Sequence, residues 1–358
     1  MNFIEIISET WVHHGNSAFP NIVKLNNSDL ICGFNVGDGP EATGGSDWAR
    51  STDNGNSWQY AGVILPCQEN PLRANSMRLS RTADGRVIAY GQRSYPEGDS
   101  FKFGTMKIDS VFCTADTACR AWSQPTTIPL QAQVPIEVSN PMIILQDGRW
   151  LAPAGLLTDK AHLGERVVVR ESLNEGKNWD NEYTVFADPK GVKGFFEFKI
   201  VETTPGTLIA FAWTVELGTY KDFNNHYSIS HDGGKNWSVP KATTINGQTL
   251  TPLWLGGDDF LLIYNYRQTP QGIRIAQAKI TDSECKIGKD ELLWQPGAKS
   301  PASAEQTIED GIDTFDDFKF GLPSLTQLAD KSFIAVFWCF EAGKYGVKSI
   351  KLNINNFS

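Results

Sequence analysis

Long apolar runs are missing from the sequence, and so are the spacings that mark common metal and disulfide sites. No uninterrupted apolar stretch of about 18 residues occurs, so the sequence predicts no membrane-spanning helix. The six cysteines are scattered without a C-x-x-C pair, which argues against a zinc site and against a dense disulfide framework. Helical stripes are also lacking over windows of about ten residues or more. We therefore expect a β-rich chain that needs no metal or cofactor.

Basic residues are outnumbered, since 32 lysines and arginines face 41 aspartates and glutamates and leave a formal net charge of −9. This excess of negative charge is spread along the chain and argues against nucleic acid and anionic membranes as partners. An anionic substrate needs only a local arginine cluster and stays open. The N-terminal stretch MNFIEIISETWVHHG lacks the basic start and apolar core of a signal peptide. We expect a cytoplasmic protein, or a periplasmic or secreted one if a signal has been removed.

A short turn-like motif occurs three times in the sequence. STDNGNSW, SLNEGKNW and SHDGGKNW share the frame S-x-D/N-x-G-x-x-W and end at Trp58, Trp179 and Trp237. Asp or Asn bonds to nearby backbone N–H groups, Gly supplies a positive φ, and Trp brings a large apolar surface. A motif that recurs in this way predicts a structural turn. CTADTACRAW, ending at Trp122, is interpreted as a degraded copy, and Trp294 continues the spacing.

A second pattern consists of two apolar runs joined by a tight turn. It recurs at intervals of roughly 60 residues, which indicates six β-hairpins. The turns are centred on Asp29, Asp84, Asp147, Gly206, Asp258 and Asp330. With a polar third strand and a fourth strand after each hairpin, the sequence predicts an all-β fold, a six-bladed β-propeller of four-stranded antiparallel blades.

This propeller would span residues 1–358 as a single domain. The N-terminal strand NFIEIISETWV is expected to complete the last blade, which otherwise lacks a fourth strand. A polar insertion at about residues 295–318 lengthens the interval before the last blade. Cys113 and Cys119 could pair across a loop, although free thiols are favoured. The oligomeric state stays open.

With these repeats, the chain resembles the sialidase superfamily of six-bladed propellers with Asp-box repeats. The resemblance covers essentially the whole chain and implies the fold more specifically than the activity. It implies an acid/base role for Asp38 and a catalytic place for Glu197, and it assigns substrate contacts to Arg274 and Glu341. Two family residues are replaced: Asn21 or a neighbour stands where the family has a carboxylate-binding arginine, and Leu322 stands where it has a nucleophilic tyrosine. Standard sialidase activity is therefore not expected.

In a propeller, the innermost strands and the loops that leave them line a central funnel. Residues beside the first two strands of each blade are therefore the candidates for function. Carboxyl groups there would supply acid/base chemistry, while arginines and aromatic rings would bind an acidic sugar. The predicted catalytic residues are Asp38, Glu41, Glu137 and Glu197. The predicted substrate-binding residues are Arg78, Arg93, Trp213, Tyr266, Arg267, Arg274, Trp338 and Glu341.

Three functions fit these residues. The leading hypothesis is a sialidase-like glycoside hydrolase that acts on a carbohydrate with an acidic or non-standard sugar. The second is a polysaccharide lyase in which His13 or His14, with Tyr95 or Tyr266, removes a proton beside a uronate carboxylate. The third is a carbohydrate-binding propeller without catalysis. Fold alone does not choose among them.

Overall fold

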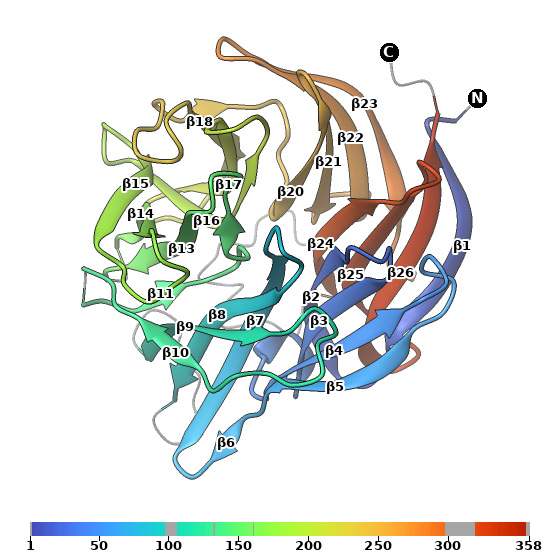
Figure 1. Cartoon of the computed structure of the whole chain (residues 1–358). Helices are drawn as coiled ribbons and strands as arrows, with labels where there is room; N and C mark the ends of the chain where they lie inside the picture. The colour runs from blue at the N-terminus through green and yellow to red at the C-terminus, as the bar shows by residue number, and fades with distance from the viewer. Residues whose placement is uncertain (1, 97–105, 132, 160, 298–318, 356–358) are drawn as a thin grey trace.

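The computed structural model describes residues 2–96, 106–131, 133–159, 161–297 and 319–355. Its strands form six antiparallel sheets arranged around a central axis, which is the predicted six-bladed β-propeller (Figure 1). Helical structure in the described residues is confined to one 3₁₀ turn, η1 (Gly39–Glu41). Within the same residues, no helix is long and apolar enough to cross a membrane.

The strands follow the chain from the innermost to the outermost position of each blade. Blade 1 holds β2 (Ser17–Lys24), β3 (Leu30–Val36), β4 (Ser46–Ser51) and β5 (Gln59–Leu65). Blade 2 holds β6 (Gln68–Glu69), β7 (Leu72–Arg81), β8 (Val87–Tyr95), β9 (Lys107–Ala115) and β10 (Thr126–Ile128). Blade 3 holds β11 (Ile136–Glu137), β12 (Ile143–Ile144), β13 (Trp150–Leu157), β14 (Leu163–Ser172) and β15 (Asn181–Ala187).

The second half of the ring repeats this order. Blade 4 holds β16 (Lys193–Glu202), β17 (Leu208–Glu216), β18 (Asp222–Ser230) and β19 (Lys241–Ala242). Blade 5 holds β20 (Leu250–Gly256), β21 (Asp259–Tyr266), β22 (Gly272–Ile280) and β23 (Cys285–Trp294). Blade 6 holds β24 (Phe320–Gln327), β25 (Phe333–Glu341), β26 (Lys344–Ile354) and β1 (Ile4–His13). All six predicted hairpins are the inner two strands of a blade. Of the predicted insertion, residues 298–318 lie outside the described part.

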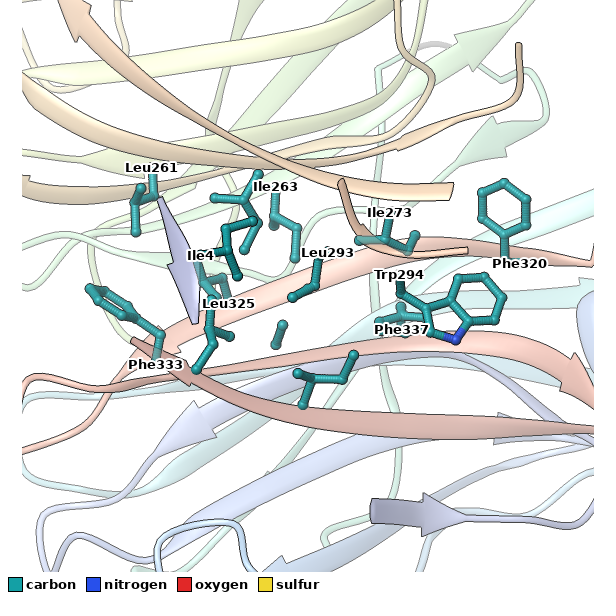
Figure 2. Close-up of a cluster of buried hydrophobic side chains, with 14 of the residues drawn as sticks. Ile4, Leu261, Ile263, Ile273, Leu293, Trp294, Phe320, Leu325, Phe333 and Phe337 are labelled. Carbon is teal, nitrogen blue, oxygen red and sulfur yellow. The ribbon is translucent and has the colours of Figure 1, made fainter. Parts of the chain in front are cut away.

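The N-terminal strand closes the ring as expected. β1 pairs antiparallel with β26, from Ile4 opposite Ile354 to His13 opposite Val347, so both ends of the chain lie together at blade 6 (Figure 1). An apolar cluster between blades 5 and 6 buries Ile4 with Leu261 and Phe333 (Figure 2). Closing the ring through paired strands removes an exposed sheet edge.

Trp294 has a different place from the one that its spacing suggested. It lies at the end of the fourth strand of blade 5, whereas Trp58, Trp179 and Trp237 follow turns between third and fourth strands. Its ring packs against Phe337 at a centroid distance of 5.1 Å and belongs to the cluster of Figure 2. The regular interval before Trp294 was coincidental, because β23 begins after a shorter turn that lacks the motif.

The three S-x-D/N-x-G-x-x-W segments share one hydrogen-bond pattern. In each of them the Gly N–H donates to the Ser hydroxyl, at 2.9 Å for Gly55, 2.8 Å for Gly176 and 2.9 Å for Gly234. The Ser hydroxyl in turn bonds to the Asp or Asn two residues later. These side-chain bonds satisfy the backbone of the turn locally, as the sequence predicted. The segments are structural turns at the end of the propeller opposite the loops that follow the second strands.

Each of these glycines also packs against the preceding blade. An added Cβ on Gly176, where φ is 79°, would lie 2.8 Å from Phe112 Cζ of blade 2. We expect Gly176→Ala to lower the free energy of unfolding by about 2–4 kcal/mol, because an overpacked contact adds to the cost of the left-handed backbone. Gly191→Ala is the matched control: φ is 63° there and nothing lies within 4 Å of the added atom. Equal urea-unfolding free energies for the two variants would contradict the packing argument.

Candidate active site at the channel mouth

The innermost strands of all six blades line a cavity on the propeller axis, with a volume of about 230 Å³. Prolines line it from four of the blades: Pro20, Pro141, Pro252 and Pro323. Proline has no N–H to donate and is tolerated at a sheet edge, so the exposed inner edges carry fewer unpaired donors. Arg78 and Lys199 also line the cavity and bring positive charge to it.

Three of the innermost strands carry a β-bulge near their start. The strand register slips in β2, β16 and β24, and the bulges hold Phe19, Glu197 and Leu322 at φ values of 54°, 44° and 44°. A non-glycine residue in this region is strained, and such strain collects at functional sites. Bulges also redirect side chains. The sequence positions of Glu197 and Leu322 were predicted to matter, but their backbone strain was not.

Glu197 lies among positive charges. It interacts electrostatically with Arg78, Lys199 and Arg267, which come from blades 2, 4 and 5. Its Oε2 atom is buried and has no hydrogen-bond partner among the described residues. A buried carboxylate oxygen without a partner is costly. The Glu197 carboxylate is therefore poised to accept a hydrogen bond from a ligand.

Arg78 provides a second unsatisfied group in the same mouth. The residue is 3% exposed, and its Nη1 atom donates to Asn35 Oδ1 at 3.2 Å and to Ser76 Oγ at 3.1 Å. Its Nε atom is buried without a hydrogen-bond partner among the described residues. Burial lowers the pKa of Arg78 to about 10, against the pull of Glu137 and Glu197. Arg78 is still a cation at neutral pH and offers a donor to a ligand.

Glu137 and Lys199 form a buried pair of opposite charge beside Glu197. Glu137 is 8% exposed and Lys199 is 6% exposed. Burial raises the pKa of Glu137 and lowers the pKa of Lys199 to about 8. The Lys199 Nζ atom donates to the carbonyl of Ser139 at 2.6 Å. This pair ties the inner strands of blades 3 and 4 together directly under the mouth.

Arg267 is fixed over an aromatic ring on the far side of the mouth. Its guanidinium carbon lies 5.7 Å from the centre of the Trp213 ring, and the Trp213 Nε1 atom donates to Asp222 Oδ1 at 2.7 Å. Burial raises the pKa of Asp222 and lowers that of Arg267. Asp222 was missed from sequence because it begins a third strand, and only the first two strands were considered. Trp213 therefore supports an arginine in this structure.

Three predicted substrate contacts belong to other networks. Trp338 is 2% exposed and packs beneath Leu322 and Phe19, so it offers no open face to a sugar. The Arg274 Nε atom donates to Asp290 Oδ1 at 2.9 Å between the outer strands of blade 5. Glu341 pairs with Lys348 Nζ at 2.6 Å. The predictions for these residues were wrong in role, because sequence does not reveal neighbours from outer strands.

The remaining candidates lie at the rim. Asp38 is exposed in the loop after β3, and its Oδ2 atom accepts a 2.6 Å hydrogen bond from Thr43. Glu41 ends η1, and its side chain lies outside the described part. Arg93 donates to Asn75 Oδ1 at 3.0 Å, and Tyr266 donates to Gln268. Asn21 bonds twice to the backbone of Leu79, so it latches blade 1 to blade 2.

The histidines considered for a lyase are engaged elsewhere. His13 Nδ1 lies 2.9 Å from Ser17 Oγ, and its ring stacks on Phe34. Burial lowers the pKa of His13. His14 stacks on Trp11 at a centroid distance of 4.2 Å. Neither Tyr95 nor Tyr266 is among these described contacts. The cysteines Cys113 and Cys119 are both free thiols.

No family model and no curated protein matches the chain. Solved structures are similar to it in fold. A protein of unknown function from Dyadobacter fermentans has a TM-score of 0.76 at 17% identity, over 99% of this chain and 100% of that one. A sialidase from Streptococcus pneumoniae scores 0.65 at 11% identity, over 99% and 71%. An α-L-arabinanase from Penicillium chrysogenum scores 0.65 at 13% identity, over 98% and 99%. At such identities the likeness establishes the fold, and the activity must be argued from the site.

Proposed function

We propose that the protein is a glycoside hydrolase that cleaves an acidic sugar from a glycan at the channel mouth. The observation that carries the proposal is the state of Glu197: a strained residue whose buried Oε2 atom has no hydrogen-bond partner among the described residues. Sugars offer hydroxyl donors to such an oxygen. The likeness in fold to a sialidase and an arabinanase, enzymes that cleave glycosidic bonds, supports this reaction class.

The positive charges around the mouth suggest the substrate class. Arg78, Lys199 and Arg267 surround Glu197 and would receive a carboxylate or another anionic group of the sugar. Arginine and lysine at this depth are weakly screened by solvent, so they would discriminate strongly against a neutral analogue. We propose a uronic or other acidic sugar on this basis.

Glu197 and Asp38 would divide the chemistry. Glycoside hydrolysis needs one group that attacks or activates water at the anomeric carbon and one that protonates the leaving oxygen. We assign the first role to Glu197. Leu322 stands where the resembled family has its tyrosine, so Glu197 would act without that intermediary. Asp38 is exposed on a rim loop at the same end of the blades and is the proposed proton donor.

A turnover screen tests this function. Wild type and Asp38→Asn would be incubated with aryl glycosides of neutral, uronic and sialic sugars and with acidic polysaccharides, and both reducing ends and ultraviolet absorbance would be recorded. We expect release from acidic substrates that falls by about 10²–10⁴-fold in the variant. An ultraviolet-absorbing product would indicate elimination instead of hydrolysis. Saturable binding without any product would make the mouth a carbohydrate-binding site.

A further inference from the structure

The backbone N–H of Glu197 has an unusual partner. Because the register of β16 jumps between Phe196 and Lys199, Glu197 has no partner residue in the ladder with β17. A bulge leaves such a residue unpaired within its own sheet. The Glu197 N–H instead donates to Glu137 Oε2 on the neighbouring blade, at 3.3 Å. A side chain of blade 3 thus takes over a bond that the blade 4 ladder does not supply.

Glu137 is itself held in place. It pairs with Gly155 in the short ladder between β11 and β13, and a Cβ on Gly155 would lie 3.4 Å from its Oε2 atom. Hydrogen bonding from the Ser139 side chain and the charge of Lys199 both favour its ionised form, against the dominant effect of burial. The carboxyl group is therefore wedged between two inner strands and has little freedom to reorient.

Blade 3 grips the bulge at neighbouring positions too. Asn140 Oδ1 accepts the N–H of Ile200 at 2.9 Å, and the Ser139 carbonyl accepts Lys199 Nζ at 2.6 Å. These contacts fix the strand on the far side of the bulge from Phe196. Glu137 completes the set at the strained residue itself. Strained backbone persists only where surrounding contacts determine it.

We infer that Glu137 is a positioning residue: its carboxyl oxygen fixes the left-handed backbone of Glu197 and so aims the Glu197 carboxylate into the mouth. The inference rests on the proposed function in taking Glu197 as the reacting group. It reassigns Glu137, which the sequence had suggested as a reacting carboxylate.

The two roles of Glu137 predict opposite effects of one substitution. A positioning bond needs only an oxygen acceptor, which the side-chain amide of glutamine also provides. A nucleophile or proton-transfer group needs the carboxyl chemistry, which glutamine lacks. Alanine removes both. The order of the variants therefore separates the roles.

The first test compares kcat and KM for Glu137→Gln, Glu137→Ala and Glu197→Gln on a substrate that wild type cleaves. We expect Glu137→Gln to keep kcat within about tenfold of wild type and Glu137→Ala to lose about 10²-fold, mainly in kcat, because misplacement by about 1 Å has this effect. A loss in Glu137→Gln as large as in Glu197→Gln would overturn the inference, since Glu137 would then react itself. Wild-type rates in Glu137→Ala would also overturn it.

The second test does not need turnover. The sequence contains two Phe–Glu pairs, Phe196–Glu197 and Phe340–Glu341, so pairwise isotope labelling isolates two amide resonances, and Glu341→Gln assigns them. We expect hydrogen exchange at the Glu197 amide to be slow in wild type and Glu137→Gln and at least about tenfold faster in Glu137→Ala. Unchanged protection in Glu137→Ala would refute the positioning role. If wild type cleaves nothing, the proposed function fails while this measurement still decides the inference.

Discussion

Replacing Glu197 with glutamine is expected to lower kcat for glycoside cleavage by about 10²–10⁴-fold and to change KM little. The side chains have nearly the same shape, so the bulge of β16 and its contacts to blade 3 should persist. Only the carboxylate that would attack or activate water is removed. The positive groups that receive the anionic sugar, Arg78 and Arg267, stay in place, and binding should survive.

Glu202→Gln is the matched control for this variant. Glu202 lies at the other end of β16, where its carboxylate accepts the N–H of Gln146 at 2.7 Å and that of Gly206 at 3.0 Å. The substitution is chemically identical but far from the mouth, and we expect kcat to stay within about threefold of wild type. If Glu197→Gln loses less than about tenfold, or if both variants lose equally, Glu197 is not the reacting group.

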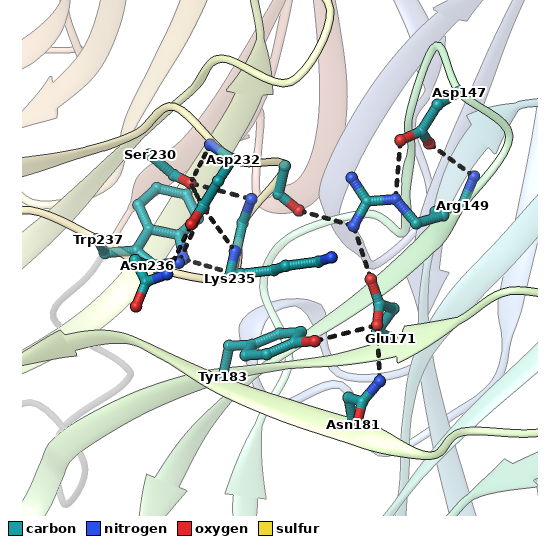
Figure 3. Close-up of polar contacts among 12 residues, drawn as sticks. Asp147, Arg149, Glu171, Asn181, Tyr183, Ser230, Asp232, Lys235, Asn236 and Trp237 are labelled. Carbon is teal, nitrogen blue, oxygen red and sulfur yellow. Dashed lines mark hydrogen bonds and ion pairs between the residues drawn. The ribbon is translucent and has the colours of Figure 1, made fainter.

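Replacing Arg149 with methionine is expected to lower the free energy of unfolding by about 3–5 kcal/mol. Arg149 donates to Glu171 Oε1 at 2.6 Å and to the carbonyl of Gly233 at 3.2 Å, so it joins blade 3 to a turn of blade 4 (Figure 3). The Glu171 side chain is 2% exposed. Removing its cationic partner leaves a buried charge with only Asn181 and Tyr183 as donors.

Arg86 offers a matched control for Arg149. Each arginine follows an Asp-Gly turn and bonds to the Asp of that turn and to a Glu elsewhere, but the Arg86 contacts to Asp84 and Glu175 are largely exposed. Exposed pairs contribute only about 0–1 kcal/mol, so Arg86→Met should be nearly neutral in urea unfolding. Comparable losses for the two variants would contradict the role assigned to burial.

Acid should reveal the same contact. Burial opposes ionisation of Glu171, but the hydrogen bonds from Arg149, Asn181 and Tyr183 outweigh it and lower the pKa of Glu171. A carboxyl group whose pKa is lowered on folding stabilises the fold fully above its ordinary value of 4.5 and loses this contribution as the pH falls through the lower folded value. The difference in unfolding free energy between wild type and Arg149→Met should therefore shrink in acid. A difference independent of pH would contradict this assignment.

Local signals were sufficient to predict the fold. The six hairpins and the serine–asparagine/aspartate–glycine turns are encoded within short segments, since their hydrogen bonds join residues only a few positions apart. Even closure by the N-terminal strand followed from a count of strands. Trp294 shows the limit of such reasoning, because its interval matched the repeat while its contacts to Phe337 belong to a different part of the blade.

The site was predictable only in part. Glu197 and Arg78 fall on innermost strands, and strand order alone brings them near the axis. The roles of Arg274 and Glu341 depend on partners from outer strands, Asp290 and Lys348, which no local pattern indicates. The bulge that strains Glu197 depends on a carboxyl group about one blade earlier in the chain. Such long-range contacts decide which of several funnel carboxylates is free to react.

The account stands or falls on what happens at the glycosidic bond, and a proton NMR time course of wild type with an acidic aryl glycoside and an acidic oligosaccharide follows that bond directly. We predict that the anomeric signal of the bound sugar is replaced by those of the free sugar, that no vinyl proton appears, and that Glu197→Gln stops the change. A vinyl signal would establish elimination and contradict the hydrolase assignment. Spectra that stay unchanged apart from the line broadening of binding would contradict catalysis at the channel mouth altogether.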